Sequence, residues 1–223
     1  MILRTSFCAA LVAFALVLAM HAPSARATVI PLPATGTDSI GNALPGGSAD
    51  PHYTVTGPGI PGGGSAAVYS PPNLWGQWVP NDAHSAWIGW SDNSDTSPHG
   101  NYTFELKFSL AGFNPASASL GGSWAADQFG SINLNGNSTG VSVPDGNWNA
   151  ANAPNLTPFT ISSGFQSGIN TLDFVVDETD GFDGLRVRNL SLTATAVPEP
   201  SAPCLLLTAG ASGLFGLIWR RRR

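Results

Sequence analysis

The residues best suited to bind a ligand are carboxylates in two short acidic loops. One loop, residues 177–183, reads Asp-Glu-Thr-Asp-Gly-Phe-Asp, and the other covers residues 92–95. Hard cations such as calcium take several oxygen ligands from a turn, although neither loop has the spacing of an EF-hand. We favour solvated acidic turns, with calcium as the alternative and the single cofactor that the sequence suggests. Its ligands in the longer loop would be Asp177, Asp180 and Asp183, and Asp127 would join them only if the fold brings it near.

Six tryptophans precede the C-terminal tail. An indole ring can stack on a sugar, and the competing role for such a large side chain is core packing. Trp87 and Trp124 lie in apolar, strand-like stretches, so we assign both to the core. The tryptophans in polar or proline-rich surroundings are the candidates for glycan stacking, namely Trp75, Trp78, Trp90 and Trp148.

Residue patterns for catalysis are weak. Residues 121–125 approach a nucleophile elbow but lack its final glycine. His52, His84 and His99 are scattered without the spacing of metal ligands. Glu105 falls on the polar side of an alternating stretch, where a solvated role is expected. We therefore expect no enzyme. A secreted hydrolase is kept as the least favoured alternative, because catalytic carboxylates pair in space and their spacing in the sequence does not reveal them.

Charge and cysteine content restrict the partners of the chain. Residues 28–197 contain three basic and thirteen acidic residues, which gives this part a net charge of −10. Such acidity argues against nucleic acid and against anionic lipid as partners. The two cysteines, Cys8 and Cys204, lie in the hydrophobic ends of the chain, so the central part has no disulfide framework.

The clearest strand pattern covers residues 101–110, where apolar and polar residues alternate strictly. Residues 170–178 alternate in the same way, and Asn135-Gly136 predicts a tight hairpin turn. In residues 184–196 the alternation changes parity, so we expect a β-bulge near Arg188 and Asn189. Other short strands are expected at residues 53–56, 66–69, 85–89, 118–125, 131–134, 140–143 and 159–162.

These patterns predict an all-β fold. Roughly eight short strands with Gly, Asn and Pro turns, and without a helical period, are typical of an antiparallel β-sandwich or jelly roll. We place this domain at residues 66–196. Residues 28–65, rich in glycine and proline, would form an N-terminal segment with one short strand.

Residues 1–27 have the parts of a secretory signal peptide. A basic start precedes an apolar run at residues 7–20, and Ala25 and Ala27 supply the small residues of a cleavage site. We therefore expect an N-terminal helix that the Sec translocon recognises and a mature chain that begins at Thr28.

Residues 197–223 form a tail in three parts. It opens with Val197, Pro198, Glu199 and Pro200. An uncharged segment from about residue 203 to 219 follows, slightly short for a hydrocarbon core of roughly 30 Å. The tail closes with Arg220, Arg221, Arg222 and Arg223, which resist translocation. We expect a C-terminal transmembrane helix whose arginines stay in the cytoplasm, and a plain anchor that is never cut is the alternative to a processed tail.

The order of Pro-Glu-Pro, apolar helix and arginine cluster resembles the PEP-CTERM sorting signal of Gram-negative bacteria. The resemblance implies that an exosortase recognises the motif and cuts near it, so that the inner membrane holds the protein only transiently. It also implies a destination at the cell surface or in the extracellular matrix, where such proteins are linked to exopolysaccharide and biofilm.

Residues 87–196 are similar to the β-rich region of many PEP-CTERM proteins and resemble the galactose-binding-like jelly roll of sugar-binding modules. The stretches that carry this resemblance are residues 102–110, 122–127, 132–136 and 168–174. We therefore expect a non-enzymatic, exported surface or matrix protein associated with exopolysaccharide. A carbohydrate-binding module with a defined glycan site and a secreted hydrolase are the alternatives.

Overall fold

The computed structural model describes residues 26–70, 77–92, 97–151 and 155–198. Residues 27–195 form one compact unit, and the terminal segments that make up the other unit lie almost entirely outside the described residues. The predicted signal-peptide helix, the predicted transmembrane helix and Trp75 also lie outside them. Within the described part of the chain, no helix is long and apolar enough to cross a membrane.

The described residues form eleven strands and no helix, which confirms the all-β prediction. The strands are β1 (Ala27–Pro31), β2 (Ala49–Gly57), β3 (Ile60–Val68), β4 (Ile88–Gly89), β5 (Gly100–Ser109), β6 (Phe113–Ala126), β7 (Phe129–Leu134), β8 (Asn137–Val143), β9 (Thr157–Ile161), β10 (Ile169–Glu178) and β11 (Leu185–Ala196).

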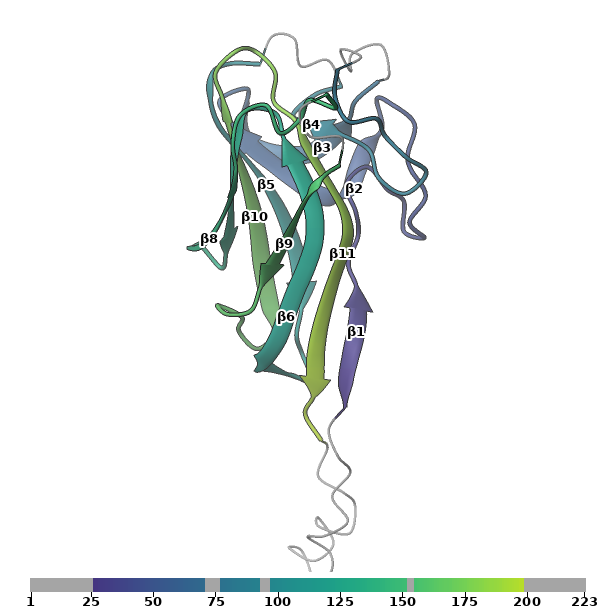
Figure 1. Cartoon of the computed structure of the whole chain (residues 1–223), viewed down its shortest axis with the longest axis vertical. Helices are drawn as coiled ribbons and strands as arrows, with labels where there is room; N and C mark the ends of the chain where they lie inside the picture. Colours follow the sequence, from purple (N-terminus) through teal and green to yellow (C-terminus); the bar gives the residue numbers. More distant parts are fainter. Residues whose placement is uncertain (1–25, 71–76, 93–96, 152–154, 199–223) are drawn as a thin grey trace, which may run out of the picture. The chain divides into compact units, whose positions relative to one another are not determined.

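The strands are hydrogen-bonded in the order β8-β7-β10-β5-β2-β3-β4-β11-β6-β9, and β1 pairs with β11. This path folds over on itself, so that β5 and β10 lie in one layer and β6, β9 and β11 in the other (Figure 1). The chain crosses between the layers from β5 to β6, from β6 to β7, from β8 to β9, from β9 to β10 and from β10 to β11. Repeated crossing of this kind is typical of jelly-roll-like β-sandwiches.

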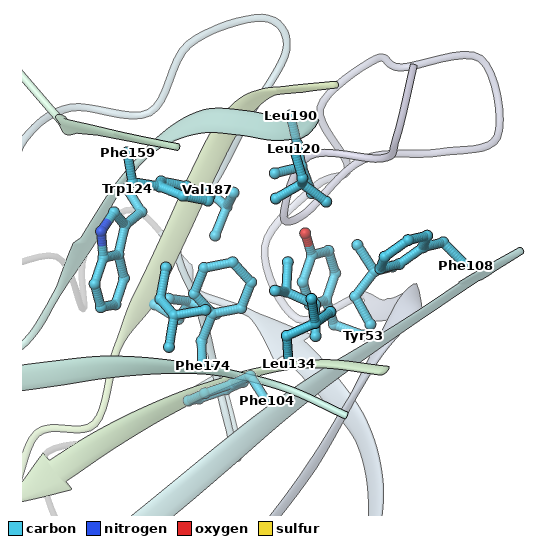
Figure 2. Packing of buried hydrophobic residues seen from close by; sticks show 14 of the residues in the cluster. Tyr53, Phe104, Phe108, Leu120, Trp124, Leu134, Phe159, Phe174, Val187 and Leu190 are labelled. Atoms are coloured by element: carbon cyan, nitrogen blue, oxygen red, sulfur yellow. The ribbon is translucent and has the colours of Figure 1, made fainter. Parts of the chain in front are cut away.

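The centre of the sandwich follows the predicted alternation. In the pairing of β5 with β10, Phe104 lies opposite Phe174 and Leu106 opposite Leu172, and all four side chains are buried. Figure 2 shows the ring of Phe174 directed toward Trp124 and Val187 of the facing layer. Burial of apolar area between two sheets is the main favourable term in a fold of this type.

Two local predictions about the backbone are confirmed. Asn135 and Gly136, between β7 and β8, have φ angles of 52° and 75°, as a two-residue hairpin turn of type I′ requires. Asn189 in β11 has a φ of 54°. This left-handed residue accounts for the change of parity, because Val187 and Leu190 on either side of it are both buried.

Residues 28–65 contain more regular structure than the sequence indicates. One short strand was expected there, and the structure has β1, β2 and most of β3. Glycines obscure the pattern of β3, because Gly62 and Gly63 add no side chain to the alternation and have φ angles of 89° and 75°. A Cβ atom at Gly57 would lie 2.4 Å from a ring atom of Tyr102, so only glycine allows this close approach of β2 to β5.

A buried arginine joins β11 to the segment before β4. Arg186 is fully buried, and its guanidinium lies 2.8 Å from the Asp82 carboxylate. It also donates to the Ser85 hydroxyl and to the carbonyl oxygens of Val79 and Pro80. A buried charge is tolerated only when its donors are satisfied in this way.

We expect replacement of this arginine, Arg186→Met, to lower the free energy of unfolding by about 2–4 kcal/mol, because the buried carbonyls would lose their donor. Chemical denaturation followed by tryptophan fluorescence measures the change. The control is Lys107→Met, which removes an exposed ion pair with Glu105 of 2.9 Å and should leave the transition unchanged. Equal stability of the two variants would contradict the role assigned to Arg186.

Candidate functional site

Three carboxylates from separate segments meet where β6 and β10 end and β11 begins. Asp127 lies in the turn between β6 and β7, Glu178 is the last residue of β10, and Asp180 lies in the loop that leads to β11. One oxygen atom of each carboxylate lies within 4.8 Å of the others. Asp127 and Glu178 are buried, whereas Asp180 is exposed, so the cluster has one open side.

Backbone and side-chain hydrogen bonds hold these segments in place. The Asp127 amide donates to the Gly184 carbonyl at 2.8 Å. Gln128 has a φ of 62°, and its side-chain carbonyl accepts hydrogen bonds from the amide and the hydroxyl of Thr179. The turn after β6 is therefore fixed against the loop after β10 through contacts on both sides of the carboxylates.

The Glu178 carboxylate is only half satisfied. Its Oε1 atom accepts hydrogen bonds from the backbone amides of Asp180 and Gly181. Its Oε2 atom is buried and has no hydrogen-bond partner among the described residues. A buried polar atom without a partner costs free energy, so this oxygen is expected to meet a donor or a cation in the functional protein.

The electrostatics of the cluster are unfavourable for three ionised groups. Burial, together with the carboxylates of Asp180 and Glu178, raises the pKa of Asp127 to about 9. Burial also raises the pKa of Glu178, against the hydrogen bonds of the loop amides, which lower it. Like charges at this separation cannot all remain ionised without a counter-charge.

A cavity of about 180 Å³ adjoins the cluster. Its walls are Gln77, Trp78, Asp127, Trp148, Asp180 and Phe182. The ring of Trp78 packs against the ring of Trp87 with a centroid distance of 4.5 Å and an interplanar angle of 53°, and this contact fixes one wall of the cavity. The Nε1 atom of Trp148 is buried without a hydrogen-bond partner among the described residues. The cavity therefore combines an aromatic wall with the carboxylates of Asp127 and Asp180.

Asp183 occupies a different position. Its carboxylate accepts hydrogen bonds from the Ser97 hydroxyl at 2.7 Å and the Trp90 amide at 2.9 Å, and Tyr69 donates to both its carboxylate and its backbone carbonyl. Burial raises the pKa of Asp183 to about 6, although these hydrogen bonds lower it. The residue links the loop before β11 to residues near β4.

The structure thus assembles a different acidic group from the one that the loop sequence suggested. Asp180 belongs to it, but Asp177 is exposed on the outer side of β10, and Asp183 is held by Ser97 and Trp90. Glu178 was missed, although its parity in β10 matches the buried Leu172, Phe174 and Val176. The fold does bring Asp127 close to Asp180, which was the condition for counting Asp127 among the candidate ligands.

The candidate tryptophans that the structure describes do not form an open platform for a glycan chain. Trp78 is buried, and Trp90 and Trp148 are half-buried. Trp87 and Trp124 are fully buried, as expected of core residues. Of the sorting tail, the structure describes Val197 and Pro198, whereas Glu199, Pro200 and the four arginines lie outside the described residues. Ala25 of the predicted signal-peptide cleavage site also lies outside them.

A larger pocket of about 770 Å³ lies beside residues 31–41, β2 and β5. His52 and His84 line it, but their ring nitrogens lie 3.4 and 3.1 Å from the backbone carbonyls of Asp38 and Gly41. In the described part of the chain, histidines do not take part in a potential metal-binding group. These contacts give both rings a local structural role.

Residues 196–223 match the family model described as the PEP-CTERM protein-sorting motif. Proteins with this motif are exported and are sorted by an exosortase. The chain therefore carries a PEP-CTERM sorting signal, and it is an exported, membrane-associated exosortase substrate. The match covers the tail alone and says nothing of the activity of the sandwich.

Several solved structures resemble the sandwich. They are an FMN-binding β-glucuronidase from Facaelibacterium prausnitzii L2-6 (14% identity, TM-score 0.39, 78% of this chain and 23% of that one), a β-D-glucuronidase from Dictyoglomus thermophilum (12%, 0.37, 77% and 29%) and a β-glucuronidase from Ruminococcus gnavus in complex with C6-substituted uronic isofagomine (10%, 0.39, 76% and 29%). This chain spans less than a third of those proteins. No curated protein was found that matches the sequence.

The raised pKa of Asp183 predicts a pH dependence of stability. A carboxyl group with a pKa of about 6 in the folded state and an ordinary value of 3.8 stabilises the fold below about pH 4, and this contribution is lost as the pH rises through 6. Its full size is about 3 kcal/mol. We expect Asp183→Asn to remove this part of the decline in the free energy of unfolding between pH 4 and 6. Urea unfolding at several pH values measures the decline. Parallel curves for the wild type and the variant would contradict the shift.

Proposed function

We propose that this chain is a non-enzymatic protein of the cell surface or extracellular matrix that associates with exopolysaccharide in a biofilm. The observation that carries the proposal is the PEP-CTERM motif at residues 196–223, which begins where β11 ends. The sandwich would be the exported part, the Sec translocon would move it across the inner membrane, and the exosortase would process its tail.

The chemistry of the sandwich supports this destination. Its net charge of −10 favours solubility outside the cell and disfavours binding to nucleic acid. Cysteine is not found between residues 28 and 197, so the folded part depends on packing and hydrogen bonds rather than on disulfides.

A non-enzymatic role is supported by the state of the two glutamates upstream of the tail. Glu105 forms an ion pair of 2.9 Å with Lys107 on the outer side of β5. Glu178 is committed to two loop amides through one oxygen.

A defined glycan site is the second candidate function. The cavity beside Trp148 favours it, because carboxylates and aromatic walls are suited to the hydroxyl groups and apolar face of a sugar. The half-buried position of Trp148 would restrict such a site to the end of a glycan chain.

Sorting is tested by the intact mass of the protein recovered from fractionated cells. We expect the wild type in the surface or medium fraction, with residues 1–27 and the tail from near Pro198 removed. Replacement of Pro198, Glu199 and Pro200 by alanine should leave residues 205–223 attached and the protein in the inner membrane, whereas Pro203→Ala should be processed. A wild-type protein that keeps its tail in the inner membrane would contradict sorting to the surface.

The glycan site is tested with exopolysaccharide isolated from the producing cells. We expect Trp148→Ala to weaken binding about fivefold, since one aromatic contact contributes roughly 1 kcal/mol. Phe129→Ala is the matched control, because Phe129 is an exposed aromatic residue outside the cavity. Thermal unfolding of both variants checks that they fold. Equal binding by the two variants would exclude this cavity and leave matrix association to the rest of the surface.

A further inference from the structure

We propose that Asp127, Glu178 and Asp180 bind a calcium ion that links the turn between β6 and β7 to the loop between β10 and β11. The three carboxylates come from two distant parts of the chain, Asp127 from one and Glu178 and Asp180 from the other, and one oxygen of each lies within 4.8 Å of the others. A single cation placed between these three oxygens would lie close to all of them.

An observation independent of the acidic composition points to a ligand at this place. Glu178 is fully buried, and its Oε2 atom has no hydrogen-bond partner in the part of the chain that the structure describes. Its other oxygen is fixed by the amides of Asp180 and Gly181, so the side chain cannot turn away to reach water without breaking those bonds. A cation between the carboxylates supplies the missing partner of Oε2.

The surrounding contacts hold the ligands in position before a cation arrives. The Asp127 amide is bonded to the Gly184 carbonyl, and the Gln128 side chain is bonded to Thr179. The two segments are therefore already joined on either side of the carboxylates. Less conformational freedom is lost on binding when the ligands are held in this way.

The ligand chemistry favours calcium. All three side chains offer oxygen, whereas zinc prefers nitrogen and sulfur. Calcium accepts six to eight oxygens in flexible geometry, and magnesium needs a near-ideal octahedron of smaller size. The exposed side at Asp180 and the adjoining cavity leave room for water to complete the shell around calcium. The inference concerns the sandwich alone and does not depend on where the protein is sorted.

The test uses the full chain, purified in detergent and treated with a chelator. Addition of calcium to about 100 times its dissociation constant should raise the melting temperature by about 5 °C or more. Terbium, which resembles calcium in size, should give luminescence on excitation of tryptophan, since Trp78 and Trp148 line the adjoining cavity. Calcium should displace this luminescence.

Asp180→Asn is the main variant, because Asp180 is exposed and its replacement should not impair folding. We expect it to weaken calcium binding at least tenfold in isothermal titration. The matched control is Asp177→Asn, which removes the same charge from an exposed site one residue before Glu178 and should bind as the wild type does. The absence of a calcium-dependent shift, equal effects of the two substitutions, or an equal shift with magnesium would each overturn the proposal.

Discussion

The structure depends on aromatic contact between its two layers around Phe174 of β10. The ring of Phe174 lies 5.5 Å from Trp124 of β6, 6.2 Å from Phe159 of β9 and 6.4 Å from Tyr53 of β2. One side chain thus contacts strands of both layers, and each of these four rings is buried. Aromatic pairs at these distances add directional contacts to the burial of apolar area, so they also fix how the two sheets are placed over each other.

The same strand that carries this contact positions the acidic cluster. Because β10 pairs with β5 on one side and β7 on the other, its register is fixed along its whole length. Residues of one parity point into the core, and Glu178 continues that row at the end of the strand. The buried carboxylate is therefore a consequence of strand register rather than of the loop that follows. The loop only supplies Asp180 and the amides that hold one of the glutamate oxygens.

The chain combines two parts with different physical demands. The sandwich is acidic and without cysteine, and it owes its stability to buried rings, to the Arg186 network and to hydrogen-bonded loops. The sorting motif at residues 196–223 follows directly after β11. Since β11 lies at the centre of one layer and pairs with β1, the last strand before the motif is firmly held by the domain. The acidic cluster lies near the start of this strand, at the other end from the motif's attachment.

The sequence by itself determined the fold class, the central strands, the Asn135-Gly136 turn, the change of parity at Asn189 and the sorting tail. Each of these depends on neighbouring residues in the chain, through alternation, turn chemistry or the order of a short motif. Only the tertiary structure decided that β2 and β3 belong to the sandwich, because their glycines hide the alternation, and that Asp127 meets Glu178 and Asp180. Asp127 lies some fifty residues before the other two, and the pairing of β7 with β10 brings the turn that holds it to the end of β10. Contacts of this range depend on strand order, which a pattern of local residues does not specify.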